Sequence, residues 1–256
     1  MAPDEIDERV AALYGDIDWR EASGLLHVAA IHGPSGRILK IGPDAPPSPI
    51  DRFALGLARA RADVLVTTGR ILRSEPDLVH RYSEASEEDE AIAEWRRRAV
   101  GRAERPRLLV LSETGRFPID HPAFGASQGV IWTSAAGAAA MGRPPAGFDV
   151  VQAEADRDTA RDAIASCVRT LAAERTDATV LLEAGPSTSN AFYEKTGAAR
   201  VDELLLSRFD GTIVPAAQGP VFVPEDARSA LFGAARSRRS IDEASGSWRF
   251  ERYRVD

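Results

Sequence analysis

The sequence predicts an α/β fold in which helices cover both faces of a largely parallel sheet. Three observations support this prediction. Apolar, β-branched segments alternate along the chain with Ala-rich amphipathic segments, as in repeated β-α units. The segment 247–255 alternates apolar and polar residues like an edge or antiparallel strand, so the sheet is expected to be mixed. The 256 residues are 44% hydrophobic and 28% charged, which is an ordinary globular composition.

The strands are expected in short apolar segments, and the helices in longer segments with apolar residues on one stripe. The expected strands are Leu25–Ile31, Val64–Val66, Arg107–Ser112, Val130–Thr133, Phe148–Gln152, Val180–Glu183, Val201–Arg208 and Ser247–Val255. The expected helices are Pro49–Ala62, Ser86–Val100 (charged and mostly exposed), Asp158–Ala173, Ser187–Thr196 and an Ala-rich helix after Ser134. No shift in composition divides the chain, so we expect an N-terminal arm or helix at 1–20 and a single domain at 21–256.

The charge and the cysteine content exclude several classes of function. The net charge of −7 and the pI of 5.3 disfavour nucleic-acid binding, and we interpret Arg96–Arg98 and Arg236–Arg239 as solvated faces. Cys167 is the only cysteine, and the histidines lack ligand spacing, so we expect neither a disulfide nor a metal site. The N-terminus is not a signal peptide, and no segment approaches the roughly 18 apolar residues of a membrane span, which predicts a cytoplasmic protein.

The most informative motif is the segment TVLLEAGPSTSNAF, residues 179–192. An apolar strand ends in Glu183, and a turn of small residues leads into a helix that starts near Ser187. Such a helix start can hold a pyrophosphate through backbone N–H groups. The alternative is an ordinary strand–helix turn in which Ser187 caps the helix. The motif has neither the three glycines of a Rossmann turn nor the Gly-Lys-Ser/Thr of a P-loop.

Three segments together resemble the C-terminal reductase family of the bifunctional RibD enzymes of riboflavin biosynthesis. LLEAGPSTSNAF resembles the Glu-Gly-Gly strand–loop–helix of that family, and RARADVLVTTGRILRSEPDL (59–78) resembles its helix end, strand and Asp-Asp-Pro stretch. VDELLL (201–206) resembles its Val-Asp-Glu-Leu strand. The resemblance implies a dihydrofolate-reductase-like three-layer sandwich with a mostly parallel mixed sheet. It also implies a homodimer that uses NADPH.

The activity implied by the resemblance is that of 5-amino-6-(5-phosphoribosylamino)uracil reductase, in which a hydride passes from the nicotinamide to a ribosylamino-pyrimidine phosphate. The substrate here would be that pyrimidine or a related heterocycle that can carry a phosphate. The carboxylates implied near the reaction are Glu183 and Glu75. The residues implied for the cofactor are Thr67, Thr68, Gly69, Arg70, Thr133, Ser134, Gly185, Pro186, Ser187, Thr188 and Ser189.

Ser35, Leu78 and Arg81 match substrate-side positions of the family, and Arg143 is a candidate partner for the NADPH 2′-phosphate. Ser134 could instead be only a helix cap, and Arg81 only a solvated loop residue. His80, beside Arg81, is a further candidate for substrate contact.

The sequence also departs from the family pattern. Ser35 stands where the family has Asp. The family Thr aligns with Arg70, or with Ile71 if a one-residue gap is placed earlier. Arg70 could bind an anion or could block the nicotinamide pocket. A diverged, non-catalytic protein that binds a nucleotide or another ligand is therefore the alternative function. An Arg70 side chain inside the cleft would favour it.

Overall fold

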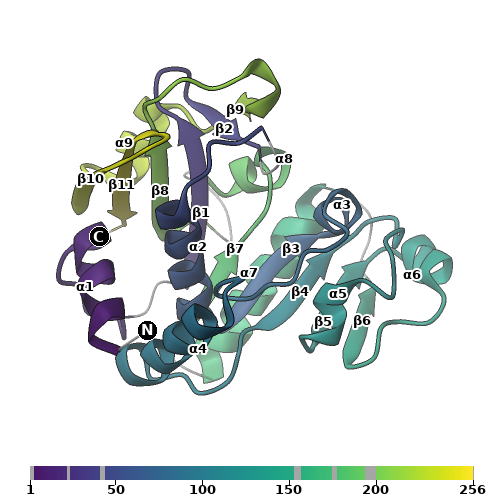
Figure 1. The fold of residues 1–256 in the computed structure, drawn as a ribbon. Helices are drawn as coiled ribbons and strands as arrows, with labels where there is room; N and C mark the ends of the chain where they lie inside the picture. The colour runs from purple at the N-terminus through teal and green to yellow at the C-terminus, as the bar shows by residue number, and fades with distance from the viewer. Residues whose placement is uncertain are drawn as a thin grey trace.

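A mixed sheet of eleven strands organises the protein, and its strand order is β10-β11-β8-β1-β7-β3-β4-β5-β6, with β2 and β9 attached beside β1 (Figure 1). The computed structural model describes residues 3–21, 24–40, 44–152, 157–174, 178–193 and 200–255. The strands are β1 (Gly24–His32), β2 (Arg37–Leu39), β3 (Val64–Thr68), β4 (Arg107–Leu111), β5 (Gly129–Thr133), β6 (Phe148–Gln152), β7 (Thr179–Leu182), β8 (Glu203–Phe209), β9 (Gln218–Val221), β10 (Ser237–Glu243) and β11 (Gly246–Arg254).

The central strands are parallel, whereas the strands at one end and the β2–β9 attachment are antiparallel. Strand β1 pairs in parallel with β7 and β8, and β3, β4, β5 and β6 continue the parallel ladder. Strand β11 pairs antiparallel with both β8 and β10. The mostly parallel mixed sheet predicted from the sequence is thus confirmed.

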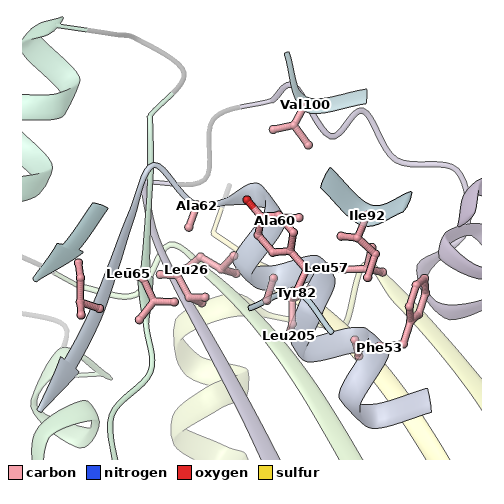
Figure 2. Close-up of a cluster of buried hydrophobic side chains, with 14 of the residues drawn as sticks. Leu26, Phe53, Leu57, Ala60, Ala62, Leu65, Tyr82, Ile92, Val100 and Leu205 are labelled. Carbon is pink, nitrogen blue, oxygen red and sulfur yellow. The ribbon is translucent and has the colours of Figure 1, made fainter. Parts of the chain in front are cut away.

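Helices cover both faces of the sheet, because side chains along each buried strand alternate between two cores. The helical elements are α1 (Pro3–Tyr14), α2 (Pro49–Arg61), α3 (Gly69–Ser74), α4 (Ser86–Trp95), the π-helical η1 (Arg96–Val100), α5 (Pro122–Gly125), α6 (Ala135–Met141), α7 (Arg157–Glu174), α8 (Pro186–Ser189), the 3-10 turns η2 (Asn190–Tyr193) and η3 (Pro215–Ala217), and α9 (Glu225–Phe232). The core under α1, α2 and α4 contains Leu65 of β3 and Leu181 of β7 (Figure 2 shows part of it). The opposite core, under α7 and α9, contains Val66 and Leu182.

The N-terminal segment contains α1, which lies beside α4 and β10. Its Ile6 and Leu13 are fully buried in the same core as α2. This helix therefore contributes apolar surface to the core on that face of the sheet. No helix in the described part of the chain is long and apolar enough to cross a membrane.

Three sequence-based expectations need correction. Arg96 does not belong to a solvated face, because it is 3% exposed and its guanidinium donates to the carbonyl oxygens of Ala60 and Ala62 at 2.6 and 2.7 Å. The helix expected at 187–196 is shorter: α8 ends at Ser189 and a 3-10 turn follows, while residues 194–199 lie outside the described part. Ser187 does not cap α8, because Gly185 occupies the N-cap position.

Candidate functional site

The candidate site lies where β3 and β7 end, at the carboxyl edge of the parallel sheet. These two strands are neighbours, and the Glu183 N–H donates to the carbonyl oxygen of Val66 at 2.9 Å. From β3 the chain continues to β4 on one side, whereas from β7 it continues to β8, which lies beyond β1 on the other side. The connections therefore diverge between β3 and β7. Open α/β sheets bind ligands at such topological switch points.

Glu183, the residue directly after β7, is held by Arg59 near the end of α2. Arg59 Nε and Nη2 donate to the two Glu183 carboxylate oxygens at 2.7 Å each, and the two side chains are 11% and 13% exposed. Burial alone would raise the pKa of Glu183, but the charge and hydrogen bonds of Arg59 outweigh burial and hold this pKa below its usual range. Glu183 is therefore an oriented anion at neutral pH.

Arg59 also fixes the loop between α3 and α4. Its Nη1 donates to the carbonyl oxygen of Arg81 at 2.8 Å, while the Arg81 side chain is exposed. A single guanidinium thus joins the end of β7 to the loop that carries the predicted substrate residues. Leu78, in the same loop, is half-buried.

Glu75 follows α3 and has the opposite electrostatic environment from Glu183. Burial and the nearby negative charge of Glu183 raise the pKa of Glu75, although Arg59 and His121 act against this rise. The Glu75 backbone is fixed, because its carbonyl oxygen accepts from the Leu78 N–H at 3.1 Å and bonds to His121 Nε2 at 2.9 Å. Of the two predicted carboxylates, Glu75 therefore takes up a proton more readily.

The turn after β3 is tightly packed. Thr68 caps α3, since its Oγ1 accepts from the Ile71 N–H at 3.3 Å. A Cβ on Gly69 would lie 2.6 Å from Ser112 Oγ, so the end of β4 requires glycine here. Thr67 is fully buried and its Oγ1 has no hydrogen-bond partner. Arg70 is exposed.

The turn after β7 has free space next to Gly185. Gly185 is the N-cap of α8, and its carbonyl oxygen accepts from the N–H groups of Thr188 and Ser189 at 2.9 and 3.0 Å. A Cβ on Gly185 would meet no atom within 4 Å, and its φ of −65° suits any residue. Pro186 is half-buried and Ser187 is exposed. Ser189 is buried, and its Oγ has no partner.

The remaining predicted residues lie around β5 and in other loops. Thr133, the last residue of β5, and Ser134 both donate to the carbonyl oxygen of Glu113, at 3.4 and 2.8 Å. Ser134 Oγ also accepts from the Gly137 N–H at 2.9 Å, so its predicted alternative role as a helix cap is confirmed. Ser35 lies in the exposed turn between β1 and β2, and its Oγ lies 2.9 Å from His32 Nδ1. Arg143 is exposed after α6.

Sequence reasoning missed Arg59 and gave His80 only a minor place. Burial lowers the pKa of His80 to about 4, so this imidazole is neutral at physiological pH. The negative charge of Glu183 raises this pKa and the positive charge of Arg59 lowers it, but burial outweighs both. A possible sequence signal for Arg59 was its position in an apolar, Ala-rich helix, where an arginine needs a partner.

Comparison with solved structures identifies the class of fold. A pyrimidine reductase-like protein from Corynebacterium diphtheriae is similar with a TM-score of 0.59 and 18% identity, over 97% of this chain and 98% of that protein. RibD of Acinetobacter baumannii gives a TM-score of 0.57 and 15% identity, and the alignment covers 93% of this chain but only 58% of RibD. The riboflavin biosynthesis reductase of Saccharomyces cerevisiae gives a TM-score of 0.53 and 10% identity, with coverages of 99% and 100%.

The chain therefore has the α/β fold of the pyrimidine reductase-like and RibD structures. The resemblance to the RibD C-terminal family is thus confirmed as a likeness of fold. No protein-family model matches the sequence, and no curated protein matches it at a significant level.

Proposed function

We propose that the protein is an NADPH-dependent reductase that transfers a hydride to a ribosylamino-pyrimidine or a related heterocycle. The observation that carries this proposal is the arrangement at the β3–β7 switch point. There an anionic Glu183, fixed by Arg59, lies directly beside a turn whose outer side is open at Gly185. The similarity in fold to solved reductase-like structures supports the same proposal.

The residues at this edge fit a dinucleotide. A phosphate can approach the backbone at Gly185 because no side chain occupies the space where its Cβ would lie. Two hydroxyl oxygens at this edge, Thr67 Oγ1 and Ser189 Oγ, are buried without a hydrogen-bond partner. Thr68 and Gly69 would hold the cofactor from the β3 side. Ser134 would contribute from the β5 side, although its hydroxyl already bonds to Glu113 and Gly137.

When bound, the nicotinamide would supply the hydride, and the protein would supply position, exclusion of water and a proton. Reduction of a C=N bond consumes one proton in addition to the hydride. Glu183 is a poor source of this proton because Arg59 stabilises its ionised form. Glu75 is the better proton carrier, since its pKa is raised. Glu183 would instead orient the substrate through its fixed carboxylate.

The alternative function, a non-catalytic binding protein, was considered because the Arg70 side chain could block the nicotinamide pocket. Arg70 is exposed, which removes this reason for favouring the alternative. Turnover separates the two functions, because a protein that only binds would hold NADPH without oxidising it when heterocyclic substrates are offered.

The direct test is calorimetric titration with NADPH and NADH, using Gly185→Trp and the matched control Gly125→Trp. Both glycines have open space at the Cβ position and negative φ, but Gly125 lies before β5 at the opposite edge. We expect micromolar NADPH binding that weakens by at least about tenfold, or 1.4 kcal/mol, in Gly185→Trp only. No binding of either nucleotide to the wild-type protein would refute the proposal.

We also propose a cytoplasmic homodimer, as the resemblance and the single cysteine suggest. Light scattering coupled to size-exclusion chromatography would give about twice the 27.6 kDa chain mass if the protein is a dimer. A mass equal to one chain at micromolar concentration would contradict the dimer without affecting the site.

A further inference from the structure

A cavity of about 310 Å³ lies on the face of the sheet that α2 covers. It is lined in part by the loop whose Arg81 carbonyl oxygen accepts from Arg59. Its lining includes Leu65, Leu108, His80, Arg81, Arg105 and Ser127. Leu65 and Leu108 are near the beginnings of β3 and β4, so the cavity is displaced from the carboxyl edge where the cofactor is proposed to bind. Its volume suits a small ring compound.

The side of the cavity toward the sheet is apolar. Leu65 and Leu108 are direct neighbours in the parallel ladder, and adjacent strands lie about 4.8 Å apart. Both leucines are buried, so they close the cavity on this side. Pro106 and Ala126 add further apolar lining.

Among the polar residues of this lining, His80 is the one whose side-chain polar atoms are buried without a partner. Both ring nitrogens are buried and neither has a hydrogen-bond partner. The other buried histidines are satisfied: His27 Nδ1 lies 2.6 Å from Tyr193 Oη, and His121 bonds to the backbone of Glu75 and Ala123. A buried polar group without a partner destabilises the fold unless a ligand or water completes its bonding.

The two arginines of the cavity differ in their freedom. The Arg105 guanidinium pairs with Asp89 and lies over the Tyr82 ring, 4.6 Å from its centroid. In Arg81 only the backbone is fixed, through Arg59, and the side chain is exposed. Arg81 can therefore turn toward an anionic group at the cavity mouth.

We propose that His80 is a positioning residue for the substrate: its imidazole forms a hydrogen bond with a planar nitrogen heterocycle that enters this cavity. Because a neutral imidazole offers one donor and one acceptor, it can pair with a ring N–H or a ring carbonyl. An anionic substituent of the heterocycle would reach Arg81. This inference rests on the proposed reductase function, for which it specifies how the ring is recognised.

The test compares two probes, uridine 5′-monophosphate and ribose 5-phosphate, which share a sugar phosphate but differ in the ring. Calorimetry on the wild-type protein should show uridine 5′-monophosphate binding at least about tenfold more tightly, because only this probe fills the cavity. His80→Phe should weaken its binding by about three- to tenfold, the effect of one neutral hydrogen bond, and leave ribose 5-phosphate unchanged. His80→Gln, which keeps a donor and an acceptor, should retain most of the affinity.

NADPH titrations of the same variants separate the two proposals. Unchanged NADPH affinity in both variants is expected, since His80 lines the cavity and no residue of the turn at Gly185 does. If the wild-type protein binds NADPH but binds both probes equally, or if His80→Phe leaves uridine 5′-monophosphate affinity intact, the role of His80 is refuted and the reductase stands. Absence of NADPH binding with His80-dependent binding of uridine 5′-monophosphate refutes the reductase alone.

A measurement on the wild-type protein covers the case in which His80→Phe does not fold. Nitrogen-15 shifts of the His80 imidazole should move on addition of uridine 5′-monophosphate, because one ring nitrogen gains a partner. They should not move with ribose 5-phosphate. Shifts that stay constant with the first probe at saturation overturn the proposal.

Discussion

Replacing Arg59 by Met tests whether this guanidinium organises the site. Methionine keeps an unbranched side chain but removes the charge and both donors to Glu183, whose side chain is only 13% exposed. Removing one partner of a buried ion pair leaves an uncompensated charge, which typically costs about 3–5 kcal/mol. The bond to the Arg81 carbonyl, made at 2.8 Å, is lost as well. We therefore expect urea unfolding at pH 7 to show a loss of about 3–5 kcal/mol.

The pH dependence of this loss distinguishes an unpaired carboxylate from a simple packing defect. In the wild-type protein the pKa of Glu183 is lowered, so its contribution to stability is present above the unfolded pKa and is lost as the pH falls through the folded pKa. Without Arg59, burial dominates and raises this pKa. The variant can then protonate Glu183, and its deficit relative to the wild-type protein should shrink between pH 7 and pH 5.

Arg102→Met is the matched control. Arg102 and Asp63 form a second buried pair, at 2.8 Å and with exposures of 6% and 11%, at the opposite edge of the sheet. Its removal should also destabilise the fold but should leave NADPH affinity unchanged, whereas Arg59→Met should weaken it. A loss below about 1 kcal/mol in Arg59→Met, or an equal loss at both pH values, would show that the pair does not stabilise a buried anion.

Two further predictions concern the surroundings of the site. Gly69→Ala places a Cβ 2.6 Å from Ser112 Oγ and should lower the free energy of unfolding, measured with urea, by about 1–3 kcal/mol. A change within about 0.5 kcal/mol would contradict this prediction, because it would mean that Ser112 moves aside at little cost. Burial opposes ionisation of Glu203, but Arg61 and Arg252 hold its pKa at about 2, so the fully buried carboxylate stabilises the fold above its ordinary pKa of 4.5. As the pH falls from 4.5 toward 2, the wild-type protein should lose about 3 kcal/mol that Glu203→Gln does not lose, and parallel pH profiles would contradict this assignment.

Much of the fold could be predicted because its buried strands are continuous apolar segments. Strands β3, β4 and β7 are covered on both faces, so their sequences carry a strong signal. Strand β10 was missed for the converse reason. Its sequence SRRSIDE is polar because much of it is exposed at the edge of the sheet, and its conformation depends on antiparallel pairing with β11. Such a strand is defined by its partner rather than by its own pattern.

The site was only partly predictable for a related reason. The position of Glu183 and of the turn at Gly185 follows from local sequence, since a strand, a small-residue turn and a helix start are contiguous. Arg59 lies 124 positions from Glu183, and only the packing of α2 across the sheet brings them together. The unpartnered ring of His80 is also a tertiary property, because no local pattern tells whether a histidine will find a partner.

The two carboxylates of the site acquire different roles from one arginine. Arg59 Nε and Nη2 both donate to the Glu183 carboxylate. Glu75 therefore experiences the charge of Arg59 only at longer range. Glu75 also experiences the negative charge of Glu183, and its pKa rises while that of Glu183 falls. Two carboxylates with pKa values displaced in opposite directions suit a fixed anion and a proton carrier in one site. In the proposed reductase, the first would orient a polar ring and the second would deliver a proton.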